Sequence, residues 1–187
     1  TVHDPYPHTG EGDRFMRDYE HKKPIIHAVR RRADCIIVHG QDVKKQLLEV
    51  QPELSPDKIL VVLHGAMKYV LRWKRPDYVE KPGSILFFGR IHAYKGLGLM
   101  WEAWQRVREA CPNARLVVAG TGNDLHNYQA RVLADPRCEL IGREIDPPEI
   151  AKLFAECSIV AVPYLEATQS GPLALAVAFG KPAVATN

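Results

Sequence analysis

The chain has 187 residues, of which 46% are hydrophobic and 25% charged, a composition typical of a globular protein rather than a disordered one. The net charge is only +3 and no RNA- or DNA-binding signature is present, so we expect no nucleic-acid partner. No apolar run approaches the length of a membrane span, and the four cysteines lie too far apart for a zinc site or a short disulfide framework. We therefore expect a cytoplasmic location.

The first third of the chain alternates between strand and helix patterns. Residues 3–14 are rich in Asp, Pro, Gly and His and predict a long loop. A helix follows over residues 16–32, with Pro24 predicted to kink it or to end it early. The next elements are a strand at 35–39, a helix at 41–50 and a strand at 59–63. Basic residues gather near Arg31 and face either water or anionic lipid, which leaves peripheral membrane contact open.

Residues 67–82 have no clean periodicity and predict a linker. Alternation then resumes, with strands at 85–88, 116–119, 138–141, 159–162 and 182–185 and helices at 97–110, 125–133, 148–157 and 172–179. This order predicts an α/β fold of two Rossmann-like domains with parallel sheets, one over residues 1–66 and one over 83–187. We expect about three strands in the first domain and five in the second.

The segment SILFFGRIHAYKG, residues 84–96, is the most informative stretch of the chain. A buried strand ends at Gly89, two cations follow at Arg90 and Lys95, and a helix begins directly behind them. In an open α/β sheet such a loop lies at the carboxyl ends of the strands, where ligands bind. Cations beside a helix N-terminus suit a phosphate-bearing ligand, although a solvated basic turn explains the same residues.

Two other strand ends carry weaker signals. Gly120 and Gly122, in the sequence Gly-Thr-Gly, allow close backbone approach, but a plain strand-to-helix turn explains them equally well. Gly142 and Arg143 follow the next strand in the same geometric role. The guanidinium of Arg143 is expected either to stack on a base or to pair with Glu144.

The last crossover brings several polar groups to one strand end. A carboxylate, two polar side chains and the start of a helix follow the strand at 159–162; the residues are Glu166, Thr168, Gln169, Ser170 and Gly171. Ser170 is a predicted N-cap and Pro172 a predicted first-turn residue of that helix. Near the start of the chain, His3 is expected to hydrogen-bond a polar ligand rather than a metal, because its spacing from His8 matches no strong metal motif.

The chain resembles retaining nucleotide-sugar-dependent glycosyltransferases of group 1 (family 4), which have the GT-B fold. Besides the motifs above, the stretches that carry the resemblance are TVHDPYPHTGE, RRADCIIVHGQDVKKQL, LVVAGTG and IVAVPYLEATQSGPLALAVAFGKPAVAT. The resemblance implies that Arg90 and Lys95 hold the donor diphosphate without a metal or other cofactor. It places His3 and Glu166 at the donor sugar as catalytic residues. The remaining donor-site residues that it implies are Gly89, Gly120, Gly142, Arg143, Thr168, Gln169, Ser170 and Gly171.

The chain also departs from the family pattern. Leu175 stands where a second glutamate is common, and Pro172 removes one N–H from the helix start. Both chain ends look cut inside domains, so we expect a fragment that alone transfers no sugar. The function expected of the parent protein is sugar transfer to a saccharide, lipid-linked or small-molecule acceptor. The alternatives are a sugar-nucleotide epimerase of the same fold and a silent nucleotide-sugar-binding subunit.

Overall fold

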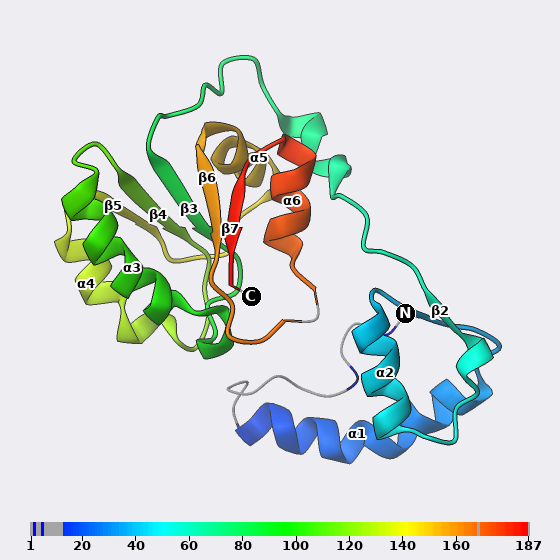
Figure 1. Cartoon of the computed structure of the whole chain (residues 1–187). Helices are drawn as coiled ribbons and strands as arrows, with labels where there is room; N and C mark the ends of the chain where they lie inside the picture. Colours follow the sequence, from blue (N-terminus) through cyan, green and yellow to red (C-terminus); the bar gives the residue numbers. More distant parts are fainter. Residues whose placement is uncertain (1, 3–4, 6–12, 168, 187) are drawn as a thin grey trace. The chain divides into compact units, whose positions relative to one another are not determined.

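The computed structural model describes residues 2, 5, 13–167 and 169–186, with the side chains of 13–16 left out. The chain divides into two compact units (Figure 1). The first comprises Thr1–Gly65 with Glu166–Gln169, and the second comprises Ala66–Leu165 with Ser170–Asn187. Both units combine helices with parallel strands, as the sequence predicts.

The first unit is built around a short parallel sheet. Its elements are α1 (Asp13–Arg32), β1 (Ile36–Val38), α2 (Gln41–Val50), the 3-10 helix η1 (Pro56–Lys58) and β2 (Ile59–Val61). Strands β1 and β2 pair in parallel, and Val2 forms an isolated parallel bridge with Val38. The described residues therefore show two strands and one bridge where we predicted about three strands.

Helix α1 runs through Pro24 without a break, so the predicted early end is wrong. Proline removes one backbone hydrogen bond from a helix interior. On both sides of Pro24 the helix contacts the rest of the unit. Tyr19 Oη donates to the Pro5 carbonyl oxygen at 2.9 Å, and Arg30 is buried.

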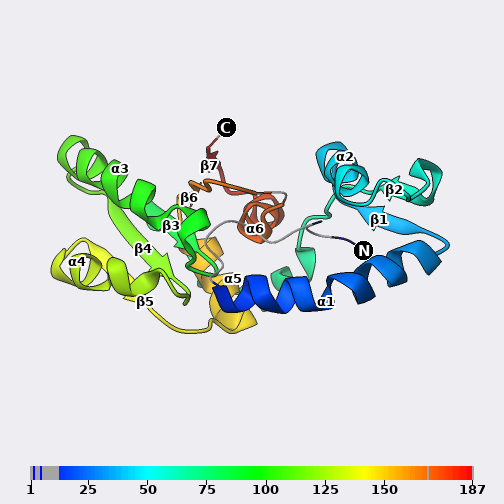
Figure 2. The same cartoon turned by 90° about the horizontal axis from the view of Figure 1, so that it is seen from below.

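The second unit is a five-stranded parallel sheet in the order β5-β4-β3-β6-β7, with β5 and β7 at opposite edges (Figure 2). In chain order its strands and α-helices are β3 (Ser84–Phe88), α3 (Leu97–Ala110), β4 (Arg115–Ala119), α4 (Gln129–Ala134), β5 (Cys138–Ile141), α5 (Pro147–Glu156), β6 (Ile159–Val162), α6 (Gly171–Phe179) and β7 (Ala183–Ala185). The helix predicted over 125–133 is divided into the 3-10 helix η4 (Leu125–Asn127) and α4. All five strands predicted for this part of the chain are present.

The two faces of this sheet carry separate hydrophobic cores. Leu86 packs with α5 and α6, whereas its neighbour Phe87 packs with α3 and Val132 of α4. This alternation follows from strand geometry, in which successive side chains point to opposite faces. The chain moves from β3 toward β5 on one face and from β6 toward β7 on the other. The topological switch point therefore lies between the carboxyl ends of β3 and β6.

The segment predicted as a linker packs against the second unit. It contains the 3-10 helix η2 (Lys68–Trp73), whose Val70 is 1% exposed and belongs to the core shared with α5 and α6. Lys181 Nζ lies 2.7 Å from a carboxylate oxygen of Glu80, and the Lys81 N–H donates to the Glu156 carbonyl oxygen. Apolar burial and these polar contacts hold the segment to the second unit.

A buried carboxylate ties α3 to the turn before β5. Asp135 is 4% exposed; it accepts a hydrogen bond from Trp104 Nε1 at 2.9 Å and pairs with Arg108 at 2.7 Å. Burial by itself would raise the pKa of Asp135. Hydrogen bonds from the Arg137 N–H and from Trp104, with the charges of Arg108 and Arg137, outweigh burial and lower it.

Replacing Asp135 by asparagine is expected to lower the free energy of unfolding by about 1–2 kcal/mol at pH 7, because charged hydrogen bonds become neutral ones. The folded pKa lies below the unfolded value of about 3.9, so the carboxylate stabilises the fold above that pH. The difference from wild type should shrink as the pH falls through the folded pKa. Urea unfolding followed by tryptophan fluorescence checks this, because Trp73, Trp101 and Trp104 all belong to the second unit.

The matched control is Glu102→Gln, which removes an exposed carboxylate from α3. It should leave the unfolding curve unchanged. A pH-independent difference between Asp135→Asn and wild type would contradict the role given to the carboxylate charge.

Candidate functional site

The loop after β3 carries the two cations that the sequence singles out. Arg90 is exposed, and its side chain makes no hydrogen bond or ion pair with any described residue. Lys95 lies at the end of the 3-10 helix η3 (Ala93–Lys95), directly before α3. Its Nζ lies 3.8 Å from the ring centroid of Tyr164 and 4.8 Å from that of Tyr94. Both cations thus follow the strand on one side of the switch point.

This loop is held against the end of β6. Gly96 has φ +72°, and a Cβ atom at this position would overlap the carbonyl oxygen of Pro163. The N–H of Leu165 donates to the Tyr94 carbonyl oxygen at 2.7 Å. Only glycine permits both the backbone angle and the close approach. The residues that follow β3 and β6 are therefore joined at the switch point.

The Gly-Thr-Gly turn after β4 is explained by packing within the chain. Gly120 has φ +137°, and a Cβ there would overlap the carbonyl oxygen of Gly89. A Cβ at Gly122 would overlap the carbonyl oxygen of Ile91. The N–H of Ile91 also donates to the Thr121 carbonyl oxygen at 2.9 Å. The close backbone approach that we predicted here is made by the loop after β3.

Helix α6 begins beside the same loop. Ser170 is its N-cap, as predicted, and the Ser170 hydroxyl accepts a hydrogen bond from the Leu173 N–H at 3.2 Å. A Cβ built on Gly89 would lie 3.5 Å from Cγ of Pro172, which places the first turn of α6 next to Gly89. Leu175 is 4% exposed and packs in the core, so the position of the family's second glutamate faces the interior.

Arg143 lies at the outer edge of the sheet and is already paired. Its guanidinium contacts both carboxylate oxygens of Glu149, at 2.7 and 2.8 Å, and it also donates to the Glu144 carbonyl oxygen. The predicted contact with Glu144 is therefore made through its backbone carbonyl, and the carboxylate that pairs with Arg143 is that of Glu149. Asp146 caps α5 by accepting a hydrogen bond from the Glu149 N–H, which places the Glu149 carboxylate opposite Arg143.

The structure brings together only part of the predicted site. Around the switch point lie residues of the second unit: Gly89, Arg90, Lys95, Gly120, Ser170 and Gly171. Gly142 and Arg143 follow the edge strand β5, and Glu166 and Gln169 are grouped with the first unit. His3 and Thr168 lie outside the described residues.

Sequence reasoning missed the two tyrosines that contact Lys95. Tyr94 directly precedes Lys95 and is 3% exposed, and Tyr164 is 8% exposed. Burial raises the pKa of the Tyr164 phenol, the hydrogen bond from Ser170 opposes the rise, and Tyr94 adds to it. Tyr164 is therefore a neutral phenol that presents a ring to the cation. The available signal was an aromatic residue at each of two strand ends, beside Lys95 and before Glu166.

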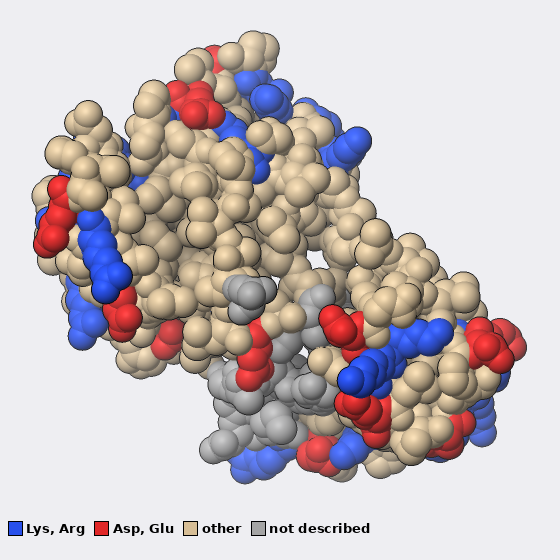
Figure 3. Space-filling view, viewed as in Figure 1, with Lys and Arg blue, Asp and Glu red and all other residues tan. Residues whose placement is uncertain are grey.

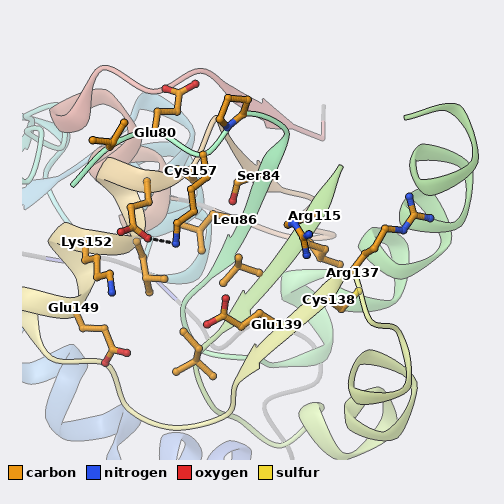
Figure 4. Close-up of a pocket in the computed structure, with 18 of the residues that line it drawn as sticks. Glu80, Ser84, Leu86, Arg115, Arg137, Cys138, Glu139, Glu149, Lys152 and Cys157 are labelled. Atoms are coloured by element: carbon orange, nitrogen blue, oxygen red, sulfur yellow. Dashed lines mark ion pairs between the residues drawn. The ribbon is translucent and has the colours of Figure 1, made fainter. Parts of the chain in front are cut away.

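The large groove in Figure 4 does not lie at the switch point. Its volume is about 760 Å³, and its walls include the starts of strands, at Ser84 and Arg115, and the helix α5, at Lys152 and Glu156. A dashed line in Figure 4 marks the ion pair between Lys81 and Glu156, at 2.6 Å. Ligands of open α/β sheets bind at the carboxyl ends of the strands. We therefore place the candidate site at the switch point and not in this groove.

On the visible face of the molecule, the described charged side chains do not form one broad patch of a single sign. On the face shown in Figure 3, Lys and Arg side chains are scattered among Asp and Glu. Among the described residues, no helix is long and apolar enough to cross a membrane. In the same part of the chain, no three His, Cys, Asp or Glu side chains are grouped as a metal site would require. The cations at the switch point are thus a local feature.

Comparison with known proteins identifies similar chains. Residues 82–187 match the family of glycosyl transferases group 1. A GDP-mannose:glycolipid 4-beta-D-mannosyltransferase of Xanthomonas campestris pv. campestris is 29% identical over an alignment of 110 residues, and the match covers 56% of this chain and 30% of that protein. HepE of Anabaena, solved with UDP-glucose, superposes with a TM-score of 0.67 at 17% identity and covers 87% of this chain and 47% of its own. TarM of S. aureus gives a TM-score of 0.72 at 14% identity, over 98% of this chain and 35% of its own.

These similarities agree with the architecture described above. The chain has the α/β fold of GT-B glycosyltransferases, with a parallel sheet in each unit. It spans 30% of the length of the curated mannosyltransferase that it matches.

Proposed function

The chain belongs to the glycosyl transferases group 1 family, and from this premise we propose that the protein moves a sugar from a nucleoside diphosphate sugar to an acceptor. The observation that carries the proposal is the position of Arg90 and Lys95, which follow β3 at the topological switch point. The first turn of α6 lies beside them, next to Gly89. Point charges and a helix N-terminus at one place favour a diphosphate.

The chemical task of the two cations is electrostatic. When the glycosidic bond of the donor breaks, negative charge develops on the departing diphosphate, and positioned cations stabilise it. In this proposal Arg90 and Lys95 supply the charge that a divalent metal supplies elsewhere. Sugar transfer should therefore continue in the presence of a chelator.

The donor sugar is assigned to His3 and Glu166 by resemblance to the family. The same resemblance suggests that the oxocarbenium-like sugar is met by the acceptor on the face that the leaving group vacates, with no enzyme nucleophile. That course retains the anomeric configuration. NMR of the product's anomeric proton tests retention directly, and the opposite anomer would show inversion. The test matters because the Xanthomonas relative is named a 4-beta-D-mannosyltransferase.

A donor assay separates the candidate functions. The protein as the cell makes it is incubated with GDP-mannose or UDP-glucose, with and without saccharide and glycolipid acceptors. Release of nucleotide that depends on acceptor supports transfer. Binding without turnover supports a silent nucleotide-sugar-binding subunit, and a changed sugar on intact nucleotide supports an epimerase.

The partners proposed are a nucleotide-sugar donor and a saccharide, lipid-linked or small-molecule acceptor. The Xanthomonas relative is named for a glycolipid acceptor, which favours the lipid-linked class. A cytoplasmic location with peripheral contact to the membrane fits such an acceptor. Flotation with anionic vesicles tests that contact.

Glu166→Gln is expected to reduce transfer roughly ten- to hundredfold, because a carboxylate beside the developing positive sugar is replaced by a neutral amide. The melting temperature should change little, since Glu166 is half-buried and belongs to none of the hydrophobic cores. Initial rates with donor and acceptor, measured beside thermal unfolding, check both points.

Glu144→Gln, an exposed carboxylate after β5, is the control and should keep wild-type activity. Full activity of Glu166→Gln, or a collapse of its melting temperature, would contradict the role proposed for Glu166.

A further inference from the structure

The ammonium group of Lys95 lies between two aromatic rings. Its Nζ is 3.8 Å from the ring centroid of Tyr164 and 4.8 Å from that of Tyr94. A cation within about 6 Å of an aromatic centroid is attracted by the ring quadrupole, and more strongly where water is excluded. Both rings are buried, at 8% and 3% exposure. Lys95 is half-buried, so the contact is partly desolvated.

Each ring is itself fixed by its surroundings. Tyr164 receives a hydrogen bond from Ser170 Oγ to its Oη at 3.4 Å, and its carbonyl oxygen accepts one from Thr186 Oγ1. Tyr94 stacks on His92 with an interplanar angle of 14°, and His92 Nδ1 lies 2.7 Å from Asn123 Oδ1. The rings thus connect the loops that follow β3, β4 and β6.

Because a lysine side chain is flexible, the aromatic contacts can lower the entropy cost of ordering Lys95. A lysine side chain has many rotamers, and ordering it costs entropy each time it binds a ligand. A ring on one face of the ammonium removes much of that freedom before the ligand arrives. A ring face uses none of the three ammonium N–H donors as a conventional hydrogen bond.

We propose that Tyr164 is a positioning residue that holds the Lys95 ammonium, through its ring face, in the orientation that binds the donor diphosphate. This inference rests on the proposed function, since it takes Lys95 as a diphosphate ligand. Tyr164 belongs to the loop after β6 and Lys95 to the loop after β3, so their contact crosses the switch point. Diphosphate affinity should therefore depend on the loop after β6 as well as on the loop after β3.

Isothermal titration of the protein as the cell makes it with GDP, UDP and inorganic pyrophosphate tests the proposal. Tyr164→Leu should weaken diphosphate binding about three- to thirtyfold, the size expected for a partly desolvated cation–π contact. Tyr164→Phe keeps the ring and should bind within about twofold of wild type. Lys95→Met should weaken binding, and adding Tyr164→Leu to Lys95→Met should cost nothing more.

The control for core packing is Phe179→Leu. Phe179 has the same 8% exposure as Tyr164 and lies in the same core. Its loss should lower the melting temperature and leave diphosphate affinity unchanged.

The outcomes distinguish the inference from its premise. If the wild-type chain binds none of the three probes, or if Lys95→Met binds as wild type does, the diphosphate assignment fails and the inference with it. If Lys95→Met weakens binding but Tyr164→Leu does not, only the inference is overturned. An equal loss from Tyr164→Leu in the wild-type and Lys95→Met backgrounds would also overturn it, because Tyr164 would then act without Lys95.

Discussion

Replacing both Arg90 and Lys95 by alanine is expected to abolish measurable binding of nucleoside diphosphates, with each single substitution weakening it about ten- to hundredfold. The physical reason is that a charge-assisted hydrogen bond is worth roughly 1.5–3 kcal/mol. Arg90 is exposed and its side chain contacts no described residue through a hydrogen bond or ion pair, so its removal should not disturb the fold. Titration with GDP and UDP, beside guanosine and uridine, measures the effect.

Two controls make this experiment specific. Binding of the nucleosides should be nearly unchanged, because they carry no phosphate. Arg106→Ala removes an exposed cation from α3 and should leave diphosphate binding intact. Equal losses for nucleoside and nucleoside diphosphate would show that the two cations do not bind phosphate.

Gly120→Ala is expected to lower the free energy of unfolding of the second unit by about 3–5 kcal/mol. The residue has φ +137°, which side chains rarely adopt, and its new Cβ would overlap the carbonyl oxygen of Gly89. Backbone strain costs about 1–3 kcal/mol and overpacking a similar amount. Urea unfolding followed by tryptophan fluorescence reports the second unit. Because Gly89 directly precedes Arg90, diphosphate binding should fall as well.

Gly180→Ala separates the cost of backbone strain from the cost of overpacking. Gly180 has φ +65° at the end of α6, and nothing lies within 4 Å of its Cβ position. In this variant only backbone strain should lower the free energy of unfolding, by about 1 kcal/mol. If Gly120→Ala and Gly180→Ala lose the same stability, the close approach between the loops after β3 and β4 is not what requires glycine at position 120.

Features set by neighbouring residues could be predicted from the sequence. The β-branched and apolar runs marked every strand of the second unit, and Ser170 with Pro172 marked the start of α6. These signals are local, because a strand needs a short apolar run and a cap bonds an N–H three residues away. One local rule was only partly right. Pro24 was expected to kink or to end a helix, and the helix does not end there.

Partners far apart in the chain could not be predicted in this way. The sequence suggested Glu144 as a partner of Arg143, and Arg143 does donate to the Glu144 carbonyl oxygen, but its ion pair is with Glu149, at the capped start of α5. The Gly-Thr-Gly turn was correctly expected to allow close backbone approach. Which backbone approaches depended on β3 and β4 being neighbours in the sheet.

The candidate site likewise combines features set by neighbouring residues with features that depend on residues far apart in the chain. By itself, the sequence determined that Arg90 and Lys95 follow a buried strand and precede a helix, since a short apolar run that stops at a glycine is visible in the residues. Only the tertiary structure decided that β3 and β6 are adjacent, that the switch point lies between them, and that Tyr164 lies against Lys95. Strand order depends on the packing of two cores on opposite faces of one sheet, and that packing joins residues that no local pattern connects.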